Sequence, residues 1–179
     1  MVTFALDGGY SLRCLEERDV AKLHAVVVAN REHLARWMPW AREQTEQQTL
    51  EFIRATRRQV DRNDGFQTAI VDELDRIVGV IGFHGVLRKD LSAELGYWLA
   101  ADTQGRGVMT AAASTLVDHA FSALELNRVE IRVAVGNARS RAIPERLGFK
   151  PEGTLREAER VGDRYHDVVV YAMLARDWR

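Results

Sequence analysis

The middle of the chain reads AELGYWLAADTQGRGVMTAAASTLVDHA from Ala93 to Ala120. Its first seven residues, Ala93 to Leu99, are apolar and aromatic with few interruptions, which predicts a β-strand. From Val108 onward the apolar residues recur at steps of three and four, which predicts a helix. The segment between them contains two glycines within four residues. This stretch therefore predicts a strand, a glycine-rich turn and a helix in direct succession.

The glycine-rich turn is a candidate anion site. The first N–H groups of a helix lack partners within the helix, and the helix dipole places partial positive charge at the same end. Glycines let the backbone approach a ligand closely, so the turn suits a phosphate or pyrophosphate. A simple tight turn is the alternative, because the segment lacks the ending of a P-loop and the spacing of a dinucleotide fingerprint. The residues of this predicted site are Gln104, Gly105, Arg106, Gly107, Val108, Met109 and Thr110.

The flanking segments predict a mixed α+β sheet. The clearest strand is Val129 to Val135, where apolar and polar residues alternate. Further strands are expected at Tyr10–Leu15, at Phe66–Val71 and Ile77–Phe83 as a hairpin, around Phe149–Leu155, and at His166–Leu174. Helices are expected with Val20, Leu23, Val27 and Val28 on one face, from about Thr49 to Val60, and from Asn137 to Leu147. Antiparallel strands thus come first and a strand-helix-strand unit follows.

Composition narrows the classes of protein. The chain has 179 residues, 46% of them apolar, and a net charge of -1, so we expect one domain over residues 1–179. Near-neutral charge argues against a nucleic-acid-binding surface, and no segment approaches the ~20 apolar residues of a membrane span or predicts a signal peptide. The single cysteine, Cys14, excludes an internal disulfide and fits a cytoplasmic setting. The histidines do not cluster at metal-ligand spacing, so no metal is expected.

A second motif carries a family resemblance. About thirty residues after the glycine turn come Asn137-Ala138-Arg139-Ser140 and then Leu147-Gly148-Phe149. With this order of motifs the chain resembles the GNAT superfamily of N-acetyltransferases, and specifically the RimJ/RimL-type ribosomal-protein N-terminal acetyltransferases. Further matches are Leu34–Trp40, Glu94–Leu99, Glu152–Arg156, Tyr165–Asp167 and Tyr171. The resemblance implies a mostly antiparallel sheet with a V-shaped opening between its fourth and fifth strands.

The same resemblance implies acetyl-CoA as the co-substrate. Its pyrophosphate would lie on the glycine turn, and its pantetheine arm would pair with the backbone of Tyr97, Trp98 and Leu99, where an amide polarises the thioester. Asn137 matches the asparagine that binds the pantetheine or sulfur region, although an ordinary helix N-cap explains it as well. Among the arginines that could meet a phosphate, we favour Arg106 in the turn over Arg139, Arg141 and Arg146.

Two residues are the catalytic candidates. Ser140 matches the serine that gives a proton to the CoA sulfur; the alternative is an ordinary polar residue near a helix start. Many members of the superfamily carry a tyrosine acid four residues before the Gly-Phe pair, but this chain has Pro144 there, which favours Ser140. The resemblance implies that Glu159 matches the carboxylate proposed as general base in RimJ/RimL-type enzymes; the alternative is a solvated loop. Glu157 and Glu94 are reserve candidates for the base.

The acceptor is predicted to be an α-amine. With a pKa near 7.7–8, an α-amine is roughly a tenth neutral at pH 7, whereas a lysine near 10.4 is neutral in only about four parts in ten thousand. The resemblance places Trp37 and Trp40 as an aromatic wall for a peptide N-terminus; core packing or a dimer contact are the alternatives. The acceptor is a protein N-terminus, such as that of a ribosomal protein, or a small aminoacyl compound or antibiotic. A non-catalytic acyl-CoA-binding module is the other class considered, and a homodimer stays open because close relatives are often dimers.

Overall fold

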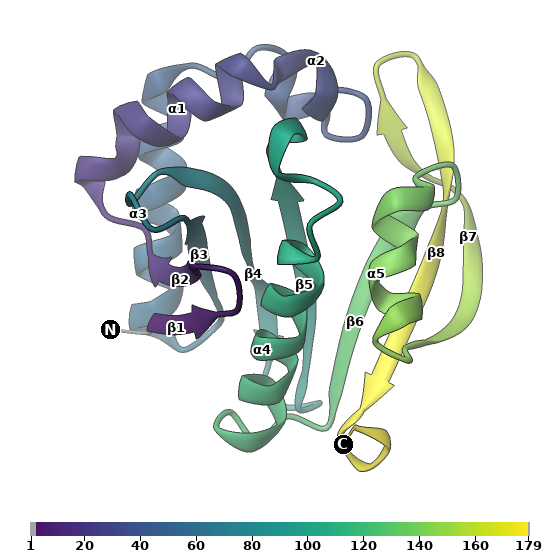
Figure 1. Ribbon diagram of the computed structural model, residues 1–179. Helices are drawn as coiled ribbons and strands as arrows, with labels where there is room; N and C mark the ends of the chain where they lie inside the picture. The colour runs from purple at the N-terminus through teal and green to yellow at the C-terminus, as the bar shows by residue number, and fades with distance from the viewer. Residues whose placement is uncertain (1–2, 179) are drawn as a thin grey trace.

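An eight-stranded sheet with helices on both faces makes up the structure, a computed structural model that describes residues 3–178 (Figure 1). The strands are β1 (Thr3–Leu6), β2 (Tyr10–Cys14), β3 (Phe66–Val71), β4 (Ile77–Leu87), β5 (Ser92–Leu99), β6 (Arg128–Ala134), β7 (Lys150–Val161) and β8 (Arg164–Leu174). The helices are α1 (Val20–Ala29), α2 (Arg31–Leu34), α3 (Glu46–Arg62), α4 (Val108–Ser122) and α5 (Ala138–Arg146). The predicted mixed sheet is confirmed.

Strand order in the sheet is β1-β2-β3-β4-β5-β6-β8-β7, and every neighbouring pair is antiparallel except β5 with β6. The sequence did not predict β1, which pairs Thr3 with Arg13 and continues to Leu6 with Tyr10. Because of this added edge strand, the strands predicted as fourth and fifth are β5 and β6. The hairpin of β3 and β4 is as predicted, with its turn held by the Asp72 carboxylate, which accepts from the backbone of Arg76 at 2.9 Å.

The two faces of the sheet bury separate cores. Alternation along β4 sends Ile81 into a core shared with α4 and α5, and Val80 into a second core shared with α1 and α3. In Figure 1, α4 and α5 lie on the face toward the viewer and α3 lies behind the sheet. Both faces are therefore covered, which explains why all six residues of β3 are buried.

Helix boundaries differ from the predicted ones for local reasons. The helix expected from about Thr49 begins earlier, because Thr45 accepts from the backbone N–H of Gln48 and Gln48 reciprocates in a capping box. It ends at Asn63, which adopts a left-handed conformation. In α1, Val28 is 46% exposed, so the prediction that it belongs to the buried face is wrong. Leu23 and Val27 are buried as expected.

Strands β5 and β6 diverge after a short parallel contact. They pair only from Ser92 with Arg128 to Glu94 with Glu130. Beyond that point β5 stays with β4 as far as Leu99, whereas β6 follows β8 as far as Ala134. The predicted V-shaped opening is therefore present, with one edge of β5 left without a strand partner from β6 (Figure 1).

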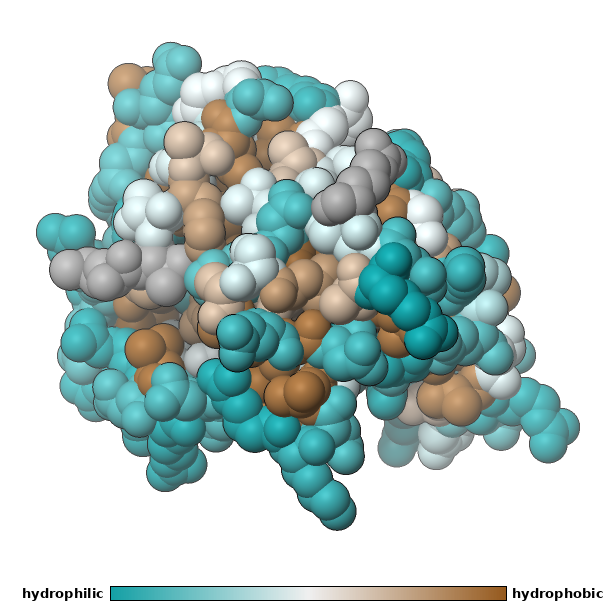
Figure 2. All heavy atoms as spheres, turned by 90° about the horizontal axis from the view of Figure 1, so that it is seen from below, coloured by the Kyte–Doolittle hydropathy of each residue, from teal (hydrophilic) through white to brown (hydrophobic). Residues whose placement is uncertain are grey.

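The end at which β5 and β6 converge is seen in Figure 2. Apolar side chains gather in the middle of that face and polar ones surround them, as expected where the sheet and its helices meet solvent. No helix within residues 3–178 is long and apolar enough to cross a membrane.

Candidate active site

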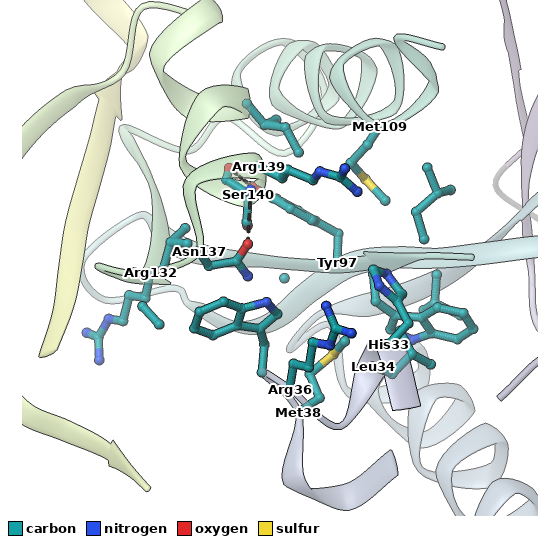
Figure 3. Close-up of a pocket in the computed structure, with 18 of the residues that line it drawn as sticks. His33, Leu34, Arg36, Met38, Tyr97, Met109, Arg132, Asn137, Arg139 and Ser140 are labelled. Atoms are coloured by element: carbon teal, nitrogen blue, oxygen red, sulfur yellow. Dashed lines mark hydrogen bonds between the residues drawn. The ribbon is translucent and has the colours of Figure 1, made fainter. Parts of the chain in front are cut away.

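The opening between β5 and β6 leads into a large cleft of about 2410 Å³. Ordinary small-molecule sites have volumes of about 300–1,000 Å³, so this one has room for two ligands at once. Its lining comes from β5, the glycine turn, α4 and α5 on one side, and from the segment after α2 and from β7 on the other. In Figure 3, Asn137, Arg139 and Ser140 project from α5, while His33, Leu34, Arg36 and Met38 face them from the α2 segment.

The glycine turn forms an open cradle at the start of α4. Gly105 and Gly107 have φ angles of 78° and 79°, which L side chains rarely adopt. A Cβ built on either glycine meets no atom within 4 Å, and both residues line the cleft. The N–H groups of the first turn of α4, from Val108 on, have no helical acceptor. This cradle fits a phosphate or pyrophosphate group.

The arginines near the turn do not lie as the sequence analysis ranked them. Arg106 is exposed, donates to the carbonyl of Asp102 at 3.0 Å, and does not line the cleft. Arg139 and Arg146 do line it. Arg139 donates to Oε1 of Gln104 at 2.8 Å, and Arg146 approaches the hydroxyl of Thr110 at 3.4 Å. These two guanidinium groups, which the sequence ranking placed second, are the ones beside the cradle.

Asn137 is the N-cap of α5. Its side-chain oxygen accepts from the backbone N–H of Ser140 at 3.3 Å, so the capping interpretation is confirmed (Figure 3). Both residues line the cleft. The cap fixes the first turn of α5 beside β5 and thereby sets the position of Ser140.

A hydroxyl pair joins α5 to β5 at this point. The Ser140 hydroxyl donates to the Tyr97 hydroxyl at 3.3 Å, and the Tyr97 hydroxyl donates to the Ser140 carbonyl at 3.1 Å. That carbonyl would normally accept from the residue four positions on, which is Pro144 and has no N–H. Tyr97 therefore supplies the hydrogen bond that the proline cannot. Burial raises the pKa of Tyr97 to about 12, so the phenol stays protonated.

Sequence reasoning noticed each of these three residues but missed the pairing. From the sequence, Tyr97 is expected to act through its backbone alone. Pro144 is notable there only because it stands where many GNAT enzymes have a tyrosine acid. Tyr97 and Ser140 lie 43 positions apart. The one available signal was the proline itself, because a proline inside a helix leaves a carbonyl that needs another donor.

Tyr97 and Trp98 face opposite sides of the sheet, as expected for neighbours on a strand. Tyr97 packs against the core under α4, and Trp98 belongs to the core under α1 and α3. Trp40 lies 6.3 Å from Trp98 between ring centroids and is 44% exposed. It lines the cleft, so one edge of the aromatic pair is open to a ligand.

Trp37 reaches from the segment after α2 to the hairpin of β7 and β8. Its ring lies 5.9 Å from the His166 ring of β8, with an edge-on geometry. It also comes within 3.2 Å of the place where a Cβ on Gly136 would stand. The φ angle of Gly136 is not positive, so the absence of a side chain there serves this close approach rather than a backbone turn.

Glu159 is a half-buried carboxyl group on β7 that lines the cleft. Burial raises its pKa above the usual value of 4.5, and His166, its cross-strand neighbour, partly opposes that shift. The reserve candidates, Glu157 and Glu94, are less suitable than Glu159 as a general base. Glu157 is exposed with a φ of 50° and does not line the cleft, while Glu94 forms a 3.4 Å ion pair with Arg132.

Metal ligands are not gathered in the part of the chain from residue 3 to 178. No group of three or more His, Cys, Asp or Glu side chains there is placed to hold a metal ion.

Comparisons with known proteins agree with this geometry. Residues 11–150 match the model of the acetyltransferase (GNAT) domain. The chain is 36% identical over 180 residues to the putative ribosomal N-acetyltransferase YdaF of Bacillus subtilis (strain 168), covering 99% of this chain and 98% of that protein. It is 30% identical over 173 residues to the ribosomal-protein-serine acetyltransferase of Escherichia coli (strain K12), covering 96% of each.

A solved structure extends the likeness to the whole fold. A RimL ribosomal L7/L12 α-N-protein acetyltransferase in complex with coenzyme A has a TM-score of 0.92 to this chain at 26% sequence identity. The match covers 97% of this chain and 98% of that one.

Proposed function

The chain belongs to the GNAT family of acetyltransferases and is an acetyl-CoA-dependent N-acetyltransferase, and we propose that its acceptor is the α-amine of a protein N-terminus. One observation carries the proposal. Ser140, Glu159 and the glycine turn line a single cleft that is large enough for two substrates. The Escherichia coli relative named above is a ribosomal-protein-serine acetyltransferase, and we extend that acceptor class to this chain.

Proton chemistry favours an α-amine. The attacking amine must be neutral, and about a tenth of an α-amine is neutral at pH 7. A carboxylate of modest basicity can remove the remaining proton from an α-ammonium group, whereas a lysine demands a much stronger base. Burial raises the pKa of Glu159, which makes its carboxylate more basic, so we assign it as the general base.

We assign Ser140 to the leaving group. Its hydroxyl proton turns from Tyr97 to the CoA sulfur and donates a hydrogen bond to it as the carbon-sulfur bond breaks. Because a thiol has a pKa of about 8.5, the departing thiolate takes up a proton readily near neutral pH. Tyr97 holds the Ser140 backbone in place through its own hydroxyl. The neutral amine gains the acetyl group and gives a proton to Glu159, the departing thiolate takes its proton from solvent, and Glu159 returns its proton to solvent.

Binding of acetyl-CoA is assigned to backbone groups and a few side chains. The cradle of Gly105 and Gly107 holds the pyrophosphate, and the unpaired edge of β5 up to Leu99 pairs with the pantetheine arm. A backbone amide on that edge polarises the thioester carbonyl, because a fixed donor needs no rearrangement as charge develops. Asn137 lies beside this path at the N-cap of α5.

The acceptor site is assigned to the far side of the cleft. Trp37 and Trp40 line it from the segment after α2, and Glu159 lines it from β7. We also propose a cytoplasmic location, on the basis of the single cysteine and the ribosomal-protein relatives. A homodimer stays a prediction that light scattering would check.

A pair of peptides tests the acceptor. One begins with a free Ser or Ala and lacks lysine; the other is blocked at its N-terminus and contains a lysine. Thiol release from acetyl-CoA and mass spectrometry should detect acetylation of the first peptide only. Transfer to the blocked peptide alone, or only to small aminoacyl compounds in a parallel panel, would contradict the proposal.

A further inference from the structure

Three side chains from three separate elements meet at the mouth of the cleft. His33 comes from α2, Gln104 from the glycine turn, and Arg139 from the first turn of α5. The Gln104 amide nitrogen lies 2.8 Å from Nε2 of His33, and its Oε1 accepts from Arg139 at 2.8 Å. Figure 3 shows Arg139 reaching from α5 toward the side of the cleft from which His33 projects. We call these three residues the mouth bridge.

The protonation state of His33 follows from the bonding. Arginine can only donate hydrogen bonds, so the oxygen of the Gln104 amide must face Arg139. The amide nitrogen then faces His33 and donates to it, which requires an unprotonated Nε2. The ring proton is on Nδ1, and the backbone carbonyl of Leu99 accepts from the ring. His33 in the mouth bridge is therefore a neutral imidazole.

The surroundings of His33 favour the neutral ring. Burial is the main cause that lowers the pKa of His33, and the guanidinium groups of Arg36 and Arg139 lower it further. Arg36 follows α2 and Arg139 belongs to α5, so positive charge acts on the ring from both sides of the cleft. Protonation would set an N–H of the ring against the N–H group of Gln104. Rotation of the Gln104 amide by about half a turn would relieve this clash, but it would take the amide oxygen away from Arg139.

We propose that His33 is a positioning residue for acetyl-CoA: the neutral ring orients Gln104, and Gln104 holds Arg139 beside the glycine cradle, where its remaining donors meet a phosphate. The proposal rests on the placement of acetyl-CoA given under the proposed function. Only one of the guanidinium donors is used by Gln104, and the side chain lines the cleft. A guanidinium held in one direction binds a phosphate better than a mobile one, because less side-chain entropy is lost.

Direct binding of acetyl-CoA, measured by calorimetry without acceptor, tests the mouth bridge. His33→Ala removes the acceptor of the Gln104 amide and should weaken binding about tenfold at about pH 8. Turnover at saturating acetyl-CoA should stay within about twofold, so that KM for acetyl-CoA changes and kcat does not.

The pH dependence separates a positioning role from a structural one. His33→Gln offers an amide oxygen near the place of Nε2 and does not titrate. Phosphate groups of CoA titrate near pH 6 as well, so the wild type and His33→Gln must be compared over about pH 8 to 5.5. Because the pKa of His33 lies below 6.5, we expect the wild type to lose more affinity than His33→Gln only toward pH 5.5, and by less than about tenfold.

His24→Gln is the matched control. His24 is a half-buried histidine of α1 whose Nδ1 lies 3.5 Å from the Thr49 hydroxyl, and it does not line the cleft. This variant should follow the wild type at every pH. Equal pH dependence in the wild type and His33→Gln, or undiminished binding by a folded His33→Ala, would overturn the proposal. Because no acceptor is present, neither result depends on whether the substrate is an α-amine.

Discussion

The two sides of the cleft are built in different ways. The side that we propose for the cofactor, called the cofactor side, consists of β5, the turn from Gln104 to Gly107 and the first turns of α4 and α5. These elements form mostly from local backbone rules. The acceptor side consists of residues 34–42 and β7, whose side chains come together from opposite ends of the chain. The cofactor side should therefore be sensitive to backbone changes, and the acceptor side to changes of side-chain shape and charge.

The largest effect on acetyl-CoA binding is expected from Gly107→Val. Gly107 has a φ of 79° and opens on the cradle, so a branched side chain would be strained and would also fill the space proposed for a phosphate. We expect acetyl-CoA affinity to fall more than about a hundredfold by calorimetry. Gly8→Val is the control, because Gly8 has a φ of 75° in the turn between β1 and β2. Normal affinity in Gly107→Val would contradict the position of the cradle.

Glu159→Gln tests the acceptor side for a general base. Removal of a base typically costs about 10²- to 10⁴-fold in rate, and the rise of kcat/KM with pH through the Glu159 pKa should vanish. Glu157→Gln, an exposed neighbour outside the cleft, should retain normal rates. If both variants have normal rates, Glu159 is not the base.

The same variant should be more stable than the wild type at neutral pH. Burial raises the pKa of Glu159, so the folded protein binds its proton more tightly than the unfolded chain does. The ionised Glu159 therefore lowers the free energy of unfolding of the wild type, and this penalty disappears as pH falls through the raised pKa toward 4.5. The gain in Tm of Glu159→Gln should be largest above that range and should shrink below it. A loss of Tm at pH 7 would contradict the burial argument.

Ser140→Ala tests the assigned role of the Ser140 hydroxyl at the leaving group, on the cofactor side. The Asn137 cap uses the backbone N–H of Ser140, so the helix start survives the substitution. Turnover should fall about 10²-fold, as when one donor to a developing charge is removed, with acetyl-CoA affinity nearly intact. Ser122→Ala at the exposed end of α4 is the control. An unchanged turnover number in Ser140→Ala would remove the serine from the mechanism.

Tyr97→Phe tests whether α5, which contains Pro144, needs the hydrogen bond from Tyr97 of β5. Loss of the phenol leaves the Ser140 carbonyl without its donor, which should cost about 1–3 kcal/mol in urea unfolding. Pro144→Ala restores a backbone N–H four residues after that carbonyl. Tyr97→Phe should therefore cost less in the Pro144→Ala background than in the wild type. Equal costs in both backgrounds would show that the two groups act independently.

The sequence predicted those parts of the molecule that follow local rules. The β3-β4 hairpin, the glycine turn before α4 and the Asn137 cap each depend on residues within a few positions of one another. Strand β1 was missed because four residues with only weak alternation carry little signal, and its pairing with β2 decides it.

The side-chain partners across the cleft could not be predicted in the same way. His33 and Gln104 lie 71 positions apart, and Tyr97 and Ser140 lie 43 positions apart. Such contacts depend on how β5 and β6 are held apart in the folded sheet, and no local sequence pattern specifies that arrangement. For the same reason the sequence did not show that Arg139 lines the cleft and Arg106 does not, since nearness to the turn in sequence does not decide which way a side chain points.

The smallest effect is expected at Gly136, where the two sides of the cleft touch. A Cβ there would stand 3.2 Å from the Trp37 ring, so Gly136→Ala should push the ring by a few tenths of an ångström. Because Trp37 also contacts His166, the neighbour of Glu159, KM for an acceptor peptide should rise about two- to fivefold. KM for acetyl-CoA should stay unchanged, as should both constants in Gly153→Ala, where a Cβ meets nothing within 4 Å. A rise in KM for acetyl-CoA alone would assign Trp37 to the cofactor side. It would also contradict the division of the cleft into a cofactor side and an acceptor side.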